Sequence, residues 1–387
     1  MPSAFSDVGL RRFHEIAASH VGEGAVPGLA ALIAHGDDVH VEVLGEATIG
    51  GPPVRRDTPF RIASTTKPIT AATVLALVRE GLLELDEPVG RLLPELASPR
   101  VLRRPDGPLD DTVPADRPIT ARDLLTFTFG FGMTFDMFLA ATPWPVVTAS
   151  NELQLATIGP PDPAVQPSAD EWIAGLGTLP LIAQPGERWL YNTGTQVLGV
   201  LAARAAGQPF DEVVRTRIAE PLGMRDTAFW SADAARLPTA YWPTPDGLVV
   251  RDPPEGDWSR PPRFADGSGG LLSTVDDLLA FARMLLDGGG SILSADLVRQ
   301  MTSGQLTAAQ RSRGGLGPGF FDAKSWGFGQ AVHDDGSFGW DGGFGSTWRV
   351  DPRRGLMTIV LTQRMWETSD PPAVHRELLE ASRAALA

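Results

Sequence analysis

Four apolar residues near the start of the chain recur at the spacing of one helix face: Leu10, Phe13, Ile16 and Ala17. This spacing predicts an amphipathic helix. Residues 27–35 form a short apolar segment and residues 39–44 alternate between apolar and polar, with the turn Gly36-Asp37-Asp38 between them. Because a tight turn joins the two segments, we expect two strands that pair antiparallel.

A longer stretch, residues 68–78, carries no charge at all. A helix that is apolar on every side is typically a buried helix, and Gly81 can end it. Pro68 is tolerated because it lies in or near the first turn. The sequence therefore predicts a core helix with Ser64 at its N-terminus and Lys67 one turn further along, on the same side.

The middle of the chain mixes helical segments with irregular ones. Helix character is found in residues 119–127, 194–206 and 210–218, whereas residues 103–118, 142–168 and 242–265 are rich in Pro, Gly and Asp. Irregular stretches of this length in a compact protein are usually functional lids or disordered segments. The irregular stretches contain Trp144, Trp242 and Trp258, and since disordered segments have few aromatic residues, we expect lids or pocket walls.

The last third of the chain predicts strands again. Thr274 with Asp277 indicates a capping box that opens a helix through Leu286. Four segments then alternate apolar and polar residues between glycine turns: residues 326–333, 337–341, 346–350 and 356–362. They predict a meander of antiparallel strands, and residues 372–386 predict a closing helix.

Together these elements predict an α+β fold. Residues 1–80 and 265–387 would form an antiparallel sheet flanked by helices from both chain ends. Residues 81–264 would form an inserted, mostly helical domain with long lid loops. A pocket between the two parts is the expected place for a functional site.

Composition narrows the class of protein. With 43% hydrophobic and 21% charged residues, the chain resembles a soluble globular protein. The net charge of −14 disfavours nucleic acid and anionic membranes as partners. The absence of cysteine excludes disulfides, thiol catalysis and cysteine-ligated zinc. Residues 1–20 contain no signal-like apolar run, so we expect a cytoplasmic protein. The sequence leaves its oligomeric state open.

The candidate chemistry begins with a lysine three residues after a serine. Only Lys67 and Lys324 are lysines, and the other 31 of the 33 Lys and Arg residues are arginine. A buried lysine can lose its proton whereas arginine stays charged, so Ser64 with Lys67 one turn away could be a nucleophile and its base. The alternative is a surface lysine that follows a serine by chance. No Gly-x-Ser-x-Gly elbow is present, which disfavours a Ser/His/Asp triad.

Tyrosine is as scarce as lysine, with only Tyr191 and Tyr241 in the chain. Tyr191 ends the turn-like segment Pro-Gly-Glu-Arg-Trp-Leu-Tyr, residues 185–191, which leads into an apolar helix. A phenol beside Ser64 and Lys67 could relay a proton between them. A plain core tyrosine is the alternative.

Three ordered motifs resemble those of the serine β-lactamase and penicillin-binding superfamily. They are Ser64-x-x-Lys67, the segment that ends in Tyr191, and Trp340-Asp341-Gly342-Gly343. The chain is most similar to the β-lactamase-like esterases called family VIII carboxylesterases. Further segments follow the expected order and frame nearly the whole chain: residues 60–67, 124–132, 221–224, 269–277 and 340–351.

The resemblance implies a role for each matching residue. Ser64 would be the acylated nucleophile, Lys67 its base, and Tyr191 the group that relays the proton and protonates the leaving group. The backbone N–H groups of Ser64 and Gly343 would form the oxyanion hole. Substrate-binding residues would be Trp340, Asp341, Gly342 and Thr193. The resemblance implies a small-molecule ester or amide as the substrate, and we expect no cofactor and no metal ion.

Departures from the family pattern shift the expected activity. The pattern Tyr-x-Asn reads Tyr191-Asn192-Thr193 here, so either Thr193 replaces the Asn, which we prefer, or Asn192 takes its role. Trp340 stands where a Lys or His is common and offers no cation to a β-lactam carboxylate. Trp340 and the expected cytoplasmic location favour a carboxylesterase. The alternatives are a β-lactamase, a D-aminopeptidase or DD-peptidase, an acyltransferase, or a non-catalytic penicillin-binding module.

Overall fold

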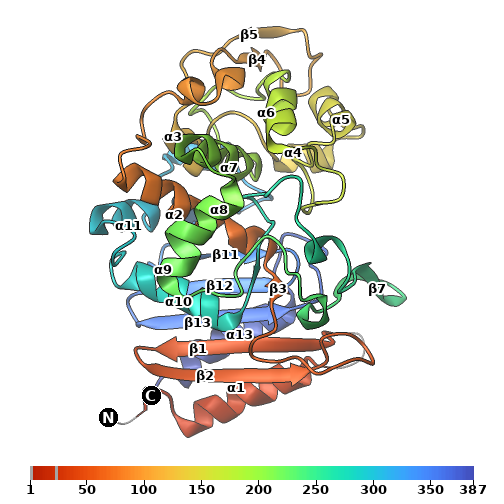
Figure 1. Ribbon diagram of the computed structural model, residues 1–387, viewed down its shortest axis with the longest axis vertical. Coiled ribbons are helices and arrows are strands. Elements are labelled where there is room, and N and C mark those ends of the chain that lie inside the picture. The colour runs from red at the N-terminus through yellow and green to blue at the C-terminus, as the bar shows by residue number, and fades with distance from the viewer. Residues whose placement is uncertain (1–2, 22–24) are drawn as a thin grey trace.

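The computed structural model describes residues 3–21 and 25–387. Its main sheet joins strands from opposite ends of the chain, and all neighbouring strands pair antiparallel (Figure 1). In spatial order the strands are β2 (Asp38–Gly45), β1 (Gly28–His35), β13 (Leu356–Thr362), β12 (Ser346–Asp351), β11 (Phe338–Gly342), β10 (Ala331–His333) and β9 (Lys324–Trp326). The predicted N-terminal hairpin and C-terminal meander are therefore confirmed.

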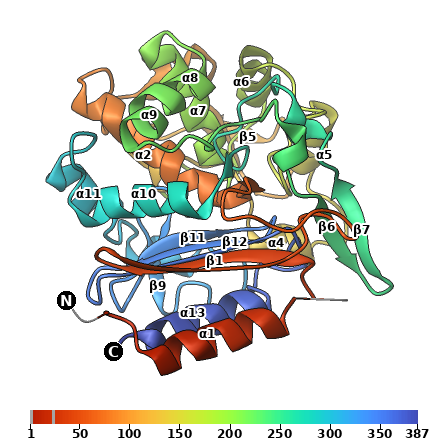
Figure 2. The same cartoon turned by 60° about the horizontal axis from the view of Figure 1, so that its bottom comes forward.

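Helices cover both faces of this sheet. The two terminal helices, α1 (Asp7–Ser19) and α13 (Ala373–Ala385), lie side by side on one face (Figure 2). The other face carries α10 (Val275–Leu286) and the buried helix α2 (Thr66–Arg79). Because both faces are covered, β1 is apolar almost throughout, and its residues alternate between the two cores. The α+β class predicted from the sequence is confirmed.

The middle of the chain forms a mostly helical part on the α2 side of the sheet (Figure 1). Its helices are α3 (Ala121–Leu125), α4 (Phe135–Leu139), α5 (Pro145–Glu152), α6 (Ala169–Gly177), α7 (Thr193–Ala206), α8 (Phe210–Val214) and α9 (Glu220–Leu222), with a π-helical turn at Arg215–Ala219. Two further short helices, α11 (Ala295–Met301) and α12 (Ala308–Ser312), precede β9. The division of the chain into two domains stays a prediction.

Three small strand pairs complete the fold. They are β3 (Phe60–Arg61) with β8 (Leu272–Ser273), β4 (Arg100–Leu102) with β5 (Thr112–Pro114), and β6 (Ala240–Thr244) with β7 (Gly247–Asp252). Within the described ranges, no helix is both long and apolar enough to cross a bilayer.

Several sequence predictions are wrong in their extent. The stretches 103–118 and 142–168, predicted to be irregular, contain β5 and α5. The single strand predicted over residues 326–333 is two strands, β9 and β10, because the chain turns between them through Gly329 at φ 69°. The stretch 242–265, predicted to be irregular, contains most of the β6–β7 hairpin, which projects from the molecule (Figure 2). The helix predicted over residues 119–127 is only the short α3, since Phe127 has a left-handed φ of 61°.

Candidate active site

Ser64 is the one residue between Thr58 and Leu77 that is not buried. A 3-10 turn, Ala63–Thr65, connects β3 to α2 and carries this serine. Ala63 has φ 40°, a left-handed conformation that costs a non-glycine residue about 1–3 kcal/mol and is found mostly at functional sites. The turn leaves the serine hydroxyl partly exposed at the start of a buried helix.

Lys67 lies in the first turn of α2, and its side chain is fully buried. Its Nζ is 2.8 Å from Ser64 Oγ and donates to the backbone carbonyl of Ser268 over 2.7 Å. Burial lowers the pKa of Lys67 to about 7, while the charge of Asp266 acts in the opposite direction. At neutral pH a large share of the Lys67 amines is therefore neutral and can accept a proton.

Tyr191 lies directly before α7, and the structure brings it to the same place. Its ring centroid is 4.6 Å from Lys67 Nζ, and its hydroxyl accepts a hydrogen bond of 2.8 Å from Trp340 Nε1. Burial raises the pKa of Tyr191 to about 12 and outweighs the hydrogen bonds of Ser64 and Trp340, which lower it. The phenol is therefore protonated at neutral pH and has a proton to donate.

Residues 127–133 hold the Tyr191 backbone in position. Met133 and Tyr191 exchange two backbone hydrogen bonds of 2.8 Å, and Leu190 N donates to Phe127 O over the same distance. Gly132 has φ 145°, and a Cβ there would lie 2.4 Å from the carbonyl oxygen of Tyr191. Only glycine fits this approach, so the loop and the tyrosine segment are matched to each other.

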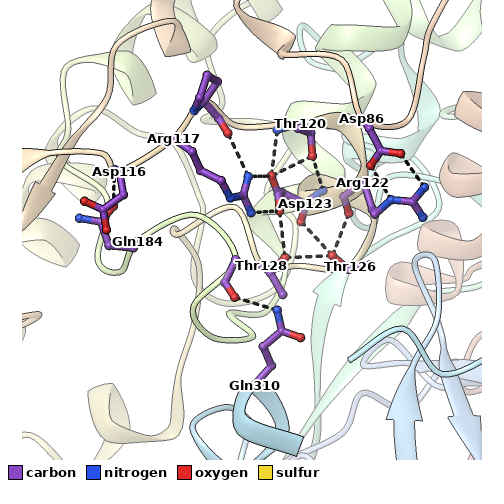
Figure 3. Close-up of polar contacts among 12 residues, drawn as sticks. Asp86, Asp116, Arg117, Thr120, Arg122, Asp123, Thr126, Thr128, Gln184 and Gln310 are labelled. Carbon is purple, nitrogen blue, oxygen red and sulfur yellow. Dashed lines mark hydrogen bonds and ion pairs between the residues drawn. The ribbon is translucent and has the colours of Figure 1, made fainter. Parts of the chain in front are cut away.

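A polar network anchors the start of that loop (Figure 3). The buried Asp123 carboxylate accepts two hydrogen bonds of 2.7 Å from Arg117 and one of 2.8 Å from the Thr120 hydroxyl. Thr120 in turn caps α3 through its side chain. The hydroxyl of Thr128 donates to the same carboxylate over 3.4 Å, so the network spans the left-handed turn at Phe127.

The glycines after Trp340 lie beside the segment that carries Ser64. Ser346 on β12 donates to the Ile62 carbonyl over 2.7 Å. Gly342 approaches the same carbonyl so closely that a Cβ would lie 2.1 Å from its oxygen. Among the described residues the N–H of Gly343 donates to no other protein group, and nothing lies within 4 Å of a Cβ placed on it. An open N–H at this point suits an oxyanion donor.

The other predicted substrate-binding residues take different positions. Trp340 is buried, donates its indole N–H to Tyr191, and packs against Trp326 with ring centroids 4.7 Å apart. Asp341 Oδ2 accepts from Arg349 Nη2 over 3.4 Å. Thr193 is fully buried, and no described residue hydrogen-bonds its Oγ1.

Asn192, the alternative to Thr193, turns toward a predicted lid. It has φ 81°, and its Nδ2 donates to the carbonyl of Thr157 over 3.3 Å. Within residues 3–21 and 25–387, the side chains of Asn192 and Thr193 make no hydrogen bond with Ser64, Lys67 or Tyr191. The substrate-binding role of Thr193, and the alternative role of Asn192, therefore stay predictions.

The sequence does not reveal two groups that act on Lys67. The Ser268 carbonyl holds Lys67, and the Asp266 carboxylate acts on its charge. Both residues lie about 200 positions after Lys67 in the chain. The local sequence around them offers one signal, an acidic residue directly before the run Gly267-Ser268-Gly269-Gly270. No three potential metal ligands among His, Asp and Glu gather in the described parts of the chain.

Comparison with known proteins gives one family match. The family model described as Beta-lactamase matches residues 13–383. Protein Rv1367c of Mycobacterium tuberculosis is 38% identical over 332 residues, which cover 81% of this chain and 79% of that protein. Esterase EstB of Burkholderia gladioli is 32% identical over 382 residues, 90% of this chain and 89% of that protein.

Solved structures agree on the fold. The structure of EstCE1, described as a hydrolase with promiscuous acyltransferase activity, superposes with a TM-score of 0.78 and covers 98% of both chains at 24% sequence identity. Simvastatin synthase LovD of Aspergillus terreus, in its LovD6 variant, gives a TM-score of 0.75 at 25% identity and covers 98% of this chain and 93% of that one.

Proposed function

The chain belongs to the Beta-lactamase family of serine hydrolases, and on that premise we propose that it cleaves carboxylic esters through an acyl-enzyme on Ser64. One observation carries the proposal: a partly exposed hydroxyl lies 2.8 Å from a lysine amine whose pKa is about 7. A nucleophile with a base inside hydrogen-bonding distance is the arrangement that acyl transfer needs.

Acylation follows from this geometry. Lys67 takes the proton of Ser64 as the oxygen attacks the ester carbonyl, and the carbonyl oxygen becomes an oxyanion. The N–H groups of Ser64 and Gly343 stabilise that charge, and each such donor typically contributes about 3–4 kcal/mol in the transition state. Tyr191 then donates its phenol proton to the departing alkoxide and recovers a proton from the Lys67 ammonium.

Hydrolysis of the acyl-enzyme runs through the same groups. Lys67, neutral again, takes a proton from the attacking water, directly or through Tyr191, and a second oxyanion forms at the same place. When this intermediate collapses, Ser64 leaves as an alkoxide and regains a proton from the Lys67 ammonium. The acid is released and the free enzyme is restored, with no net gain or loss of protons on the protein.

Two observations favour esters over β-lactams. Trp340 offers an indole at a position that often holds a cation in the family, and its N–H is already directed at Tyr191. The relative EstB, with 32% identity over 90% of this chain, is named an esterase.

A panel of substrates tests this choice. We expect kcat/KM for a short-chain p-nitrophenyl ester to exceed that for nitrocefin and for a D-alanine p-nitroanilide by about a hundredfold or more, a margin of about 2.7 kcal/mol in transition-state stabilisation. Product analysis with an added alcohol shows whether the acyl group also passes to an acceptor other than water. Faster turnover of nitrocefin or of the anilide would contradict the ester proposal.

The pH dependence tests the base. We expect kcat/KM for an uncharged ester to fall as the pH is lowered through about 7, because the Lys67 ammonium cannot accept the Ser64 proton. The sign follows from the lowered pKa: Lys67 is neutral above that value, and below it the rate drops about tenfold per pH unit. Initial rates from about pH 5 to about pH 9 measure this acid limb, the part of the pH profile in which kcat/KM rises with pH. A limb near the ordinary lysine pKa of about 10.4 would contradict it.

A further inference from the structure

Asp266 is a buried carboxylate with an unusual set of partners. It is 2% exposed and forms no ion pair with any described residue. Its Oδ2 accepts hydrogen bonds of 3.0 Å from Gln166 and from Gln196, and its Oδ1 accepts one of 2.7 Å from the backbone N–H of Ser268. Three neutral donors fit an ionised carboxylate, but none of them cancels its charge.

Asp266 opens the turn at residues 266–270, and the same turn contacts Lys67. Ser268 donates its N–H to Asp266 and accepts Lys67 Nζ at its carbonyl, so one residue separates the carboxylate from the amine. Thr70, one turn after Lys67 on α2, donates to the carbonyl of Gly267 over 2.7 Å and fixes the turn against the helix. Asp266 is the charge that raises the Lys67 pKa against the effect of burial.

Few other titratable or charged groups among the described residues face Lys67. Tyr191 faces it from the segment before α7, and Asp341 on β11 accepts a hydrogen bond from Arg349. Most charges on the elements that pack against the rest of α2 are paired near the surface: Arg204 with Glu95 and Asp170, Arg215 with Glu212 and Glu220, Arg217 with Glu80, and Arg299 with Asp296. Asp211 on α8 is exposed to solvent. Asp266 is thus the buried anion best placed to act on the Lys67 ammonium.

We propose that Asp266 is a positioning residue, the buried counter-ion that stabilises Lys67 in its protonated state and thereby sets the pH range in which Ser64 can be activated. The inference rests on the proposed role of Lys67 as the base. When Lys67 takes the serine proton, a positive charge forms where water is excluded, and a fixed anion nearby stabilises that charge more strongly than it would in water. No bond to Asp266 forms or breaks, and its carboxylate keeps its charge throughout.

Gln166 extends this arrangement to a predicted lid. It lies in the stretch 142–168, is fully buried, and reaches Asp266 with its side-chain amide. Gln196 reaches the same oxygen from α7, which follows Tyr191. The Asp266 carboxylate is therefore hydrogen-bonded to the predicted lid, to α7 and to the turn at residues 266–270.

Replacing Asp266 with asparagine removes the charge and keeps the shape. The new amide can be accommodated because Gln166 Oε1 and Gln196 Oε1 have no hydrogen-bond partner among the described residues, so that either side chain can turn its oxygen toward it. Without the anion the ammonium is less stable. We expect the acid limb of kcat/KM to move about one unit toward lower pH and the plateau to fall about tenfold or more.

A matched control separates this effect from the loss of any buried carboxylate. Asp277 on α10 is also buried and accepts hydrogen bonds of 2.9 Å from Thr227 Oγ1 and from Asp226 N. In Asp277→Asn the limb should stay at its wild-type pH. If Asp266→Asn does not fold, as judged by circular dichroism, Asp266→Ser serves as the second uncharged variant with the same expected shift.

The position of the limb decides the proposal. A folded, slower Asp266 variant whose limb remains at the wild-type pH would overturn it, as would an equal shift in Asp277→Asn, because a merely structural role changes the rate and not the limb. These results are distinct from a failure of the proposed function. If wild-type enzyme shows no limb near pH 7, or Lys67→Arg stays active, the base assignment fails before Asp266 is tested.

Discussion

Replacing Ser64 with alanine is expected to lower ester turnover by about 10⁴- to 10⁶-fold, to the level left by binding and by the oxyanion donors. The loss is large because Ser64 is the proposed nucleophile and its hydroxyl lies 2.8 Å from the Lys67 amine, a hydroxyl that alanine lacks. Rates with a short-chain p-nitrophenyl ester measure the effect. Intact mass after incubation with a fluorophosphonate should show one adduct on the wild-type chain and none on Ser64→Ala.

Ser19→Ala provides the control for this experiment. Ser19 lies at the end of α1, on the face of the sheet opposite α2, and its hydroxyl donates to the Ile16 carbonyl. We expect this variant to keep both its activity and its adduct. An adduct on Ser64→Ala, or more than about 1% of wild-type turnover, would show that another residue forms the acyl-enzyme.

Local sequence patterns were sufficient to predict the main elements of the fold. The charge-free run at residues 68–78 predicts a buried helix, and α2 is buried on every side from Thr66 to Leu77. The alternation in the C-terminal third predicts the strands that became β11, β12 and β13. Patterns of period two do not reveal where glycines break a strand, which is why residues 326–333 appear as one strand in the sequence and as β9 and β10 in the structure.

For the candidate site, too, contacts between residues close in the sequence could be predicted, whereas contacts between distant segments could not. Ser64 and Lys67 are one helical turn apart, so their contact follows from helix geometry. The position of Tyr191 could be expected only from the order of the family motifs. Asp266 could not be expected at all, because its effect on Lys67 depends on a turn about 200 positions away that meets α2 only in the folded chain.

Trp340 makes a contact that the motif alone does not predict. The sequence suggests a substrate-binding residue in place of a cation, whereas the structure directs the indole N–H to the Tyr191 oxygen over 2.8 Å. A hydrogen bond received by that oxygen stabilises negative charge on it, and it leaves the phenol proton free to point toward the reacting groups. Under the proposed mechanism the indole would therefore act on the Tyr191 phenol, while its ring packs against Trp326.

Substitution of Lys67 by arginine is expected to be as harmful as substitution by alanine, with kcat/KM lower by about 10³-fold or more in both. Arginine keeps the positive charge, but its guanidinium cannot lose a proton in the range where proteins are folded, so it cannot take the proton of Ser64. Lysine can, because burial lowers the pKa of Lys67 to about 7. Steady-state kinetics on folded variants, verified by circular dichroism, measure the loss.

The other lysine gives the matched control. Lys324 lies on β9, where its Nζ is 3.9 Å from the Phe320 ring centroid, and it makes no hydrogen bond to Ser64 or Tyr191 within the described chain. Lys324→Arg should stay within about threefold of wild-type activity. Retained activity in Lys67→Arg would remove the base role from Lys67. The proton would then have to be taken by Tyr191, and with its pKa raised to about 12 the acid limb of the rate would lie far above neutral pH.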